Sequence, residues 1–133
     1  MSYGVAAALQ AAVYQALVAA PALSGVTVQD AAPSGTLAGT YVSLGPEEVR
    51  ERITTTSGGA VHEFAVSVVT DTASFAALKE IAGAVSDALV DQAPAMTRGR
   101  IVTLAFLRAS ARRVAEGDLR RIDLTFRAHV EDD

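Results

Sequence analysis

The sequence predicts an α+β fold, in which an antiparallel (at most mixed) β-sheet packs two main helices on one face. Two segments carry apolar residues at helical spacing, and several others alternate apolar and polar residues with the period of a strand. Their order is helix, short strands, hairpin, helix and hairpin, which is typical of an antiparallel sheet with its helices on one side. With 133 residues, half of them hydrophobic, the chain is expected to be a single domain over residues 1–133.

Residues 3–20 are predicted to form the first helix. Leu9, Val13 and Leu17 recur at helical spacing, and Pro21 ends the helix because its ring clashes with a further turn. The helix has no charged residue, so we expect its own domain or a neighbouring subunit to cover most of its surface.

The apolar residues 5–23 could be taken for a targeting signal or a membrane span. No Lys or Arg precedes them, although a signal peptide needs a positive start. Gln10, Gln15 and Pro21 interrupt the apolar run. We therefore expect a soluble, unprocessed chain with no membrane segment.

Short strands are expected at residues 26–29 and 41–44. Residues 31–40 between them are rich in proline, glycine and serine and are predicted to be a loop. Gly45-Pro46 is expected to stop the second strand.

A hairpin is predicted from residues 47–56 and 61–69. Ser57-Gly58-Gly59 is expected to make the turn, because glycine supplies the positive φ angles of a tight hairpin. The second strand has apolar residues on both faces, which indicates a central place in the sheet.

The second helix is expected to be capped by Asp71 or Thr72 through a side-chain oxygen. Pro94 follows its end. Its apolar stripe at helical spacing consists of Phe75, Leu78, Ala82, Val85 and Leu89.

A final hairpin is predicted at the C-terminus. Residues 101–109 form a strand with apolar residues on both faces, and the chain is expected to turn at residues 116–118. The last strand alternates strictly, which predicts one buried and one wet face. Its apolar positions are Ile122, Leu124, Phe126, Ala128 and Val130.

Charge is distributed unevenly along the chain. The net charge of −4 argues against a protein that grips phosphate backbones. Residues 1–97 hold nine acidic and three basic side chains, whereas residues 98–133 hold eight arginines and six acidic side chains. This asymmetry either indicates association between subunits or reflects an ordinary scattered surface.

No pattern of residues indicates catalysis or metal binding. The chain has no Cys, so it offers no disulfide, thiolate nucleophile or Cys-based metal site. His62 and His129 each lack a second histidine at metal-ligand spacing and are expected to be structural. The phosphate-loop, dinucleotide, GxSxG and HExxH motifs are absent. We therefore predict no enzymatic activity, no cofactor and no metal.

Two groups of charged residues remain as candidates. Glu47, Glu48 and Glu51 are expected to form a solvated face, since an acid/base pair needs two carboxylates in different environments. Arginines near the C-terminus could contact DNA, but the lack of stacking aromatics and the interleaved acids favour salt bridges within or between subunits. They are Arg98, Arg100, Arg108, Arg112, Arg113, Arg120 and Arg121.

The chain resembles the tail-completion, or tail-terminator, family of long-tailed phages and phage-derived gene transfer agents. The resemblance is carried by the helix LQAAVYQAL, the strand YVSLG, the hairpin RITTTSGGAVHEFAVSVVT, the helix FAALKEIAGAVSDAL and the strands IVTLAFLRA and RRIDLTFRAHV. The hairpin strand that leads into the second helix is the most diagnostic piece.

The resemblance implies a structural virion protein made in the host bacterial cytoplasm. Family members assemble into a ring, usually of six copies, at the head-proximal end of the tail tube. The implied partners are further copies of the chain, the tail tube protein and the head–tail connector (stopper) protein. The ring would stop tube polymerisation and join tail to head, while DNA passes through the lumen without specific binding. The family has no catalytic residues to carry over.

A ring needs a head-to-tail contact between two different patches. We hypothesise that Glu47, Glu48 and Glu51 either meet arginines of a neighbouring subunit or line the channel. The arginines are Arg112, Arg113 and Arg120. The Ala-rich first helix and the Arg-rich C-terminal third depart from the family pattern and leave open which surface faces tube, connector or lumen.

Two other functions stay open. A head-side connector of the same joint would bind capsid-portal components rather than tail-tube protein. A ferredoxin-like small-molecule-binding or enzymatic domain would need a pocket with convergent polar groups.

Overall fold

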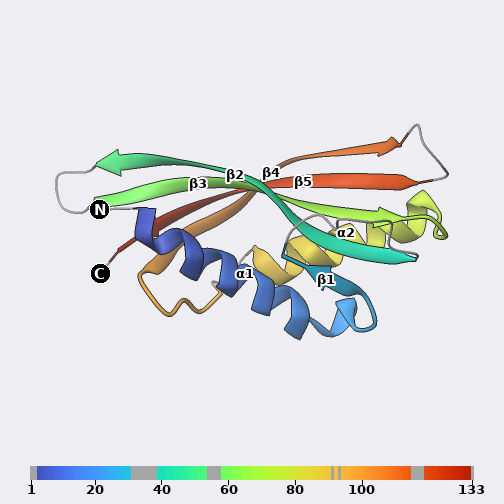
Figure 1. Ribbon diagram of the computed structural model, residues 1–133, viewed down its shortest axis with the longest axis horizontal. Coiled ribbons are helices and arrows are strands. Elements are labelled where there is room, and N and C mark those ends of the chain that lie inside the picture. Colours follow the sequence, from blue (N-terminus) through green and yellow to red (C-terminus); the bar gives the residue numbers. More distant parts are fainter. Residues whose placement is uncertain are drawn as a thin grey trace.

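Five strands form one sheet, and two helices pack on one of its faces (Figure 1). This computed structural model describes residues 3–30, 39–53, 58–90, 92, 94–114 and 119–132. The strands are β1 Thr27–Gln29, β2 Thr40–Ile53, β3 Gly58–Thr70, β4 Arg100–Arg113 and β5 Arg120–Glu131. The helices are α1 Ala6–Ala19 and α2 Phe75–Leu89, with single 3-10 turns at Tyr3–Val5 and Pro21–Leu23.

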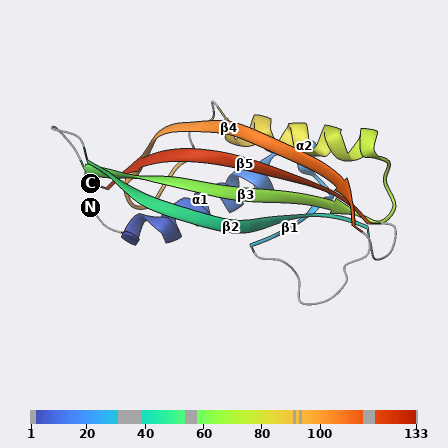
Figure 2. The ribbon, with the colours of Figure 1, turned by 90° about the horizontal axis from the view of Figure 1, so that it is seen from above.

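The strands lie in the order β1-β2-β3-β5-β4. β1 pairs parallel with β2, and the other neighbouring strands pair antiparallel. The four long strands run side by side along the molecule (Figure 2). The predicted α+β class, with a sheet that is mixed at most and both helices on one face, is confirmed.

The core lies between the helices and the sheet and centres on Phe126, which is fully buried. The Phe126 ring stacks on Phe64 with 5.7 Å between the centroids. The predicted alternation of the last strand is confirmed, because its five apolar positions are all buried. The predicted stripe of α2 is confirmed too, with Phe75 half-buried and Leu78, Ala82, Val85 and Leu89 buried.

Helix α1 buries one side and leaves the other bare. Leu9, Val13 and Leu17 are buried against the sheet and α2, as their spacing predicts. The opposite side carries alanine, glutamine and the exposed Val18, without any charge. The protein's own fold therefore covers half of this helix, and the other half stays accessible.

Two short strands that the sequence separates are parts of one long strand. The prediction that Gly45-Pro46 ends a strand is wrong, because β2 continues through them to Ile53. The pairing of β2 with β3 shifts between Leu44 and Glu47, which accommodates a proline that cannot donate to the ladder.

The glycines of the predicted hairpin turn lie inside β3. Gly58 and Gly59 pair with Ile53 and Arg52, while Ser57 lies outside the described residues. A Cβ at Gly59 would sit 2.8 Å from His129 Nε2 and 2.9 Å from the Val130 carbonyl oxygen. This glycine therefore permits the close approach of β5 and does not form the turn.

The cap of α2 also differs from the prediction. Asp71 accepts a hydrogen bond from the Gly39 amide at 2.8 Å, and Ser74 Oγ instead accepts from the Ala77 amide at 3.2 Å. The Thr70 hydroxyl accepts the amides of Thr72 and Ala73, so the chain bends for three more residues before the helix begins.

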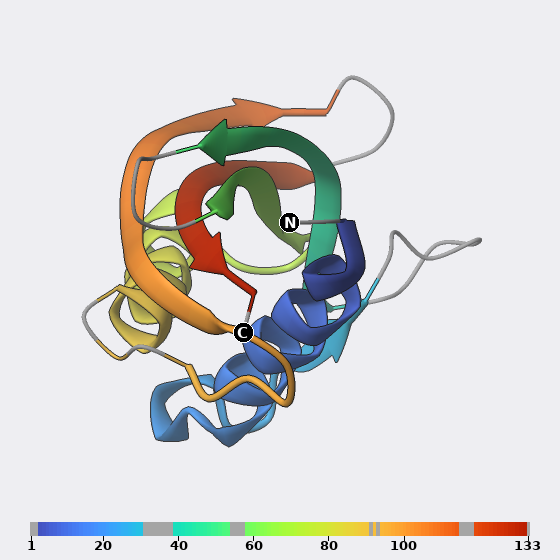
Figure 3. The same cartoon turned by 90° about the vertical axis from the view of Figure 1, so that its left-hand side faces the viewer.

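β4 is an edge strand with an exposed surface. It is longer than predicted and includes Arg112 and Arg113, whereas the predicted turn at residues 116–118 lies outside the described residues. Val102 and Phe106 are 42% and 46% exposed. Viewed along the strands, α1 lies beneath the β2 side of the sheet and α2 beneath the β4 side (Figure 3).

The two ends of the chain lie together. Gly4 lies against the Arg98 guanidinium, which forms an ion pair with Asp132 at 2.6 Å. This hydrogen-bonded pair and the negative charge of Asp132 raise the pKa of Arg98 above its ordinary value. Both termini are at the same end of the long axis, opposite the end where β4 finishes (Figure 1).

The close approach at Gly59 gives a stability prediction. Gly59→Ala should lower the free energy of unfolding by about 1–3 kcal/mol, because the new methyl group meets the backbone of β5. The matched change Gly83→Ala adds a methyl group where no atom lies within 4 Å on exposed α2, and should raise that free energy by about 0.5–1 kcal/mol. Urea denaturation followed by circular dichroism measures both. Equal stabilities of the two variants would contradict the packing described here.

Candidate assembly surfaces

The face of the sheet away from the helices, here called the open face, is basic. Residues paired across neighbouring strands share a face, so the pairing assigns each charged side chain. The arginines on the open face are Arg50, Arg52, Arg100, Arg108, Arg112, Arg121 and Arg127. Its acidic residues are Glu48, Glu63, Asp123 and Glu131. The open face is thus basic, with seven arginines against four carboxylates.

Several of these arginines form ion pairs within the chain. Arg50 pairs with Glu63 at 3.2 Å, and Asp123 holds both Arg121 at 2.9 Å and Arg112 at 3.8 Å. Arg100 pairs with Glu131 at the end of β4. The arginine side chains are 35–65% exposed, so each pair lies at the surface and contributes about 1 kcal/mol or less. Arg52, Arg108 and Arg127 have no ion pair among the described residues.

The predicted acidic cluster is split between the two faces of β2. Glu48 pairs in register with Glu63 and lies on the open face, whereas Glu47 and Glu51 pair with Phe64 and Ala60 and lie on the helix side. The register shift after Leu44 produces this split, which periodicity alone does not reveal.

Glu47 contacts a buried histidine of its own chain. Its carboxylate lies 3.4 Å from His62 Nδ1, and its side chain is 22% exposed. His62 is fully buried, and its Nε2 has no hydrogen-bond partner among the described residues. His62 thus belongs to the core, as the sequence predicts, and draws Glu47 toward that core.

The predicted arginines lie at the other end of the sheet, on the edge strand β4 and its neighbour β5. Arg112 and Arg113 end β4 and are exposed. Arg120 begins β5, donates to the Ala73 carbonyl at 3.3 Å and stacks over the Phe75 ring at 5.7 Å. The fold therefore brings none of them to the glutamates of the same copy, and any contact between the two groups must join two copies.

Sequence reasoning left six of the seven open-face arginines out of the candidate site, among them Arg108 and Arg127. Arg127 belongs to the wet face that the alternation of β5 predicts, and Arg108 was assigned only to the arginine group. The pairing of β4 with β5 brings both onto the open face. The alternation of β5 carried the signal for Arg127, whereas two register shifts in β4 hide the face of Arg108.

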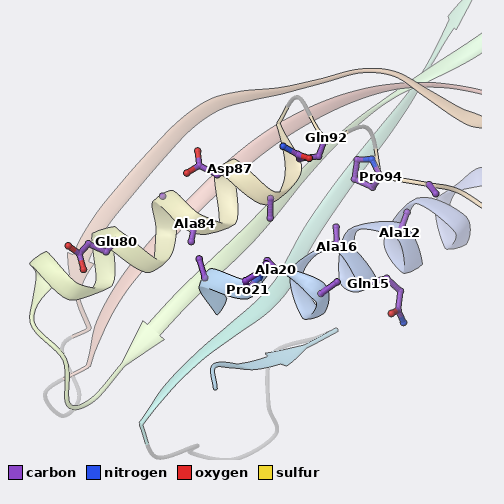
Figure 4. Close-up of a pocket in the computed structure, with 15 residues that line it drawn as sticks. Ala12, Gln15, Ala16, Ala20, Pro21, Glu80, Ala84, Asp87, Gln92 and Pro94 are labelled. Carbon is purple, nitrogen blue, oxygen red and sulfur yellow. The ribbon is translucent and has the colours of Figure 1, made fainter. Parts of the chain in front are cut away.

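A groove of about 870 Å³ lies between α1 and α2 (Figure 4). Its walls are mainly alanine, with Ala16 of α1 and Ala84 of α2 facing the space between the helices. The Asp87 carboxylate points away from α1. The described lining does not gather the convergent polar groups that small-molecule recognition requires.

Across the described ranges, no three His, Asp or Glu side chains lie close enough to share a metal ion. Neither described helix has the length and apolar character needed to cross a bilayer.

Comparisons with known proteins give a family and a solved structure that match this chain. The family model for tail completion protein gp17 matches residues 11–131. A solved chain from the virion of a native gene transfer agent particle is 59% identical, with a TM-score of 0.86, and the match covers 98% of this chain and 99% of that chain. No curated protein matches the sequence.

The sheet has helices on one face only, and the chain matches proteins of phage-like tails, so it is a structural tail protein. Within this class, the chain belongs to the tail completion protein gp17 family. The resemblance predicted from the sequence is confirmed.

The separation of the charged groups gives a prediction about assembly. Glu48→Arg or Arg112→Glu alone should weaken self-association about fivefold per contact, because each places like charges together, and the double variant should restore it. Glu48 and Arg112 are chosen because both lie on the open face. Sedimentation or native mass spectrometry measures the association, with Glu80→Arg on exposed α2 as the control. Single reversals that leave assembly intact would rule out this pairing.

Proposed function

We propose that this protein is a tail terminator, which forms a ring of six copies at the head-proximal end of a tail tube. The ring stops tube polymerisation and joins the tail to the head connector, and DNA passes through its lumen without specific binding. The protein works in the virion of a phage or gene transfer agent after synthesis in the bacterial cytoplasm. It contributes assembly contacts and no enzymatic step.

One observation carries this proposal: the match to a tail completion family over residues 11–131, together with a virion chain that is 59% identical over the full length. At this identity and coverage, the two chains share their fold over the full length. The place of the relative in an assembled particle supports a corresponding place for this protein.

The shape of the subunit supports a ring. A closed ring forms when one patch of each copy binds a different patch of the next copy. The sheet has two unlike edges, β4 on one side and the second half of β2 on the other. We retain the hypothesis that Glu47, Glu48 and Glu51 of one copy meet Arg112, Arg113 or Arg120 of the next, or line the channel.

The charge distribution is compatible with a DNA conduit. A protein of net charge −4 is not expected as a whole to hold phosphates tightly. On the basic open face, four of the seven arginines already have carboxylate partners. DNA could therefore move past such a surface without being retained.

Deletion of the gene tests the proposal. Producing cells that lack it should release tails of variable length and heads without joined tails, because nothing stops the tube or links it to the connector. Negative-stain electron microscopy of the particles measures both, and a plasmid copy of the gene should restore joined particles. Tails of normal length joined to heads would contradict the proposal. Normal but detached tails beside leaking heads would favour the head-side connector.

A further inference from the structure

The two unlike edges of the sheet suggest how neighbouring copies join. We propose that β4 of one copy pairs antiparallel with residues 47–53 of β2 in the next copy, so that the sheet continues from subunit to subunit. The inference rests on the proposed ring and adds the interface and its register.

The first argument is that β4 is a long edge strand. It runs for 14 residues without proline or an acidic side chain, and the part of it that would meet residues 47–53 exposes Phe106. An edge strand with unpaired backbone groups is a template for another strand. The two register shifts in β4 and its arginines restrict which strand can pair with it.

The second argument is that β1 leaves only part of the opposite edge free. β1 pairs with Tyr41, Val42 and Ser43 of β2, so this part of the edge is occupied. Residues 47–53 have no strand on that side among the described residues. They carry three glutamates and two arginines, whereas β4 carries arginines alone. The two free edges are therefore complementary in charge.

The third argument concerns the register. A neighbour placed level with this copy would bring the end of β4 against β1, so it must be displaced along the strands. Arg112 of β4 pairs with Arg121 of β5. Glu48 of β2 pairs with Glu63 of β3, which in turn pairs with Arg127 of β5. Arg112 and Glu48 are therefore six residues apart when both are measured along β5. A displacement of six residues moves the end of β4 past β1 and sets Arg112 opposite Glu48 on the open face.

This displacement also fits a closed ring. Strands in closed sheets tilt by about 35–45° from the axis. Four strands about 4.8 Å apart then shift successive copies by about 13–19 Å, or about four to six residues, and a shift of six lies at the upper end of this range. Six is an even number, so open face meets open face and helix side meets helix side. On the helix side, Arg113 then lies opposite Glu47 and Ala111 opposite Val49.

The helix layer leaves apolar surface exposed near the same two edges of the sheet. Beside α2, β4 leaves a groove of about 370 Å³ that includes Phe106, Ala109 and Ala111. At the β2 edge, α1 presents a side without charge that includes Ala7, Gln10 and Ala11. In the displaced register, this side of α1 approaches the groove of the neighbouring copy and covers both apolar surfaces.

The natural absence of cysteine allows a direct test in assembled particles. With a displacement of six residues, Arg50 lies opposite Ser110, whereas without displacement it would lie opposite Thr103. Mild oxidation of particles carrying Arg50→Cys with Ser110→Cys should give a ladder of covalent multimers on a denaturing gel. The matched pair Arg50→Cys with Thr103→Cys should give at least tenfold less.

Each other outcome overturns the inference. Preferential crosslinking through position 103, or none from either pair in particles with normal protein content, would refute the register. Disulfide dimers from Ser110→Cys alone would indicate a two-fold contact between β4 edges. In these cases the protein is still incorporated, so the proposed function stands. Wild-type protein that never enters the particles would defeat that function instead.

A substitution that is expected to strengthen self-association provides an independent test. The displaced register places Arg108 opposite Arg52, and like charges at directly opposed positions weaken strand pairing. Arg52→Glu should therefore strengthen self-association about twofold to fivefold, as measured by the concentration at which rings form. Glu80→Arg, remote on α2, is the control and should leave this concentration unchanged. Weaker or unchanged association of the Arg52→Glu variant would contradict the register.

Discussion

The pairing of β3 with β5 determines the rest of the structure. The two strands stay in register without a shift from Gly59 opposite Glu131 to Thr70 opposite Arg120. Because side chains alternate between faces, a slip of one residue would send the whole apolar row to solvent and the charged row into the core. This constraint places Phe64 and Phe126 under the helices and Glu63 and Arg127 on the open face. The outer strands continue these two faces, and both helices pack on the apolar one.

Much of the fold could be predicted from sequence because its central elements obey simple periods. The strict alternation of β5 and the apolar stripe of α2 each have one strong physical cause, a half-buried strand and a helix with a single buried side. The predictions are wrong where a residue that is typical of one structure is present for another reason. Gly59 resembles a turn residue but serves the close approach of β5. Gly45-Pro46 resembles a strand end, yet a register shift absorbs the proline.

The candidate site was less predictable. Glu47 and Glu48 are adjacent in sequence, and only the register after the shift reveals that they face opposite sides. Arg112 and Arg120 lie within one expected hairpin, yet one is exposed and the other is held by Ala73 and Phe75 of the preceding segment. Counts of charged residues show that one part of the chain is acidic and another part is basic. They cannot show which charged side chains share the open face, because this depends on the pairing of all the strands.

The meeting of the chain termini has a consequence for the polarity of a cyclic assembly. Gly4, Arg98 and Asp132 come together at one end of the long axis, while the end of β4 and the start of β5 lie at the other. If strand edges join the copies, one rim of the assembly displays the described chain ends of every copy. Domains fused to either terminus during evolution would then decorate a single rim, and the opposite rim could keep its contacts unchanged.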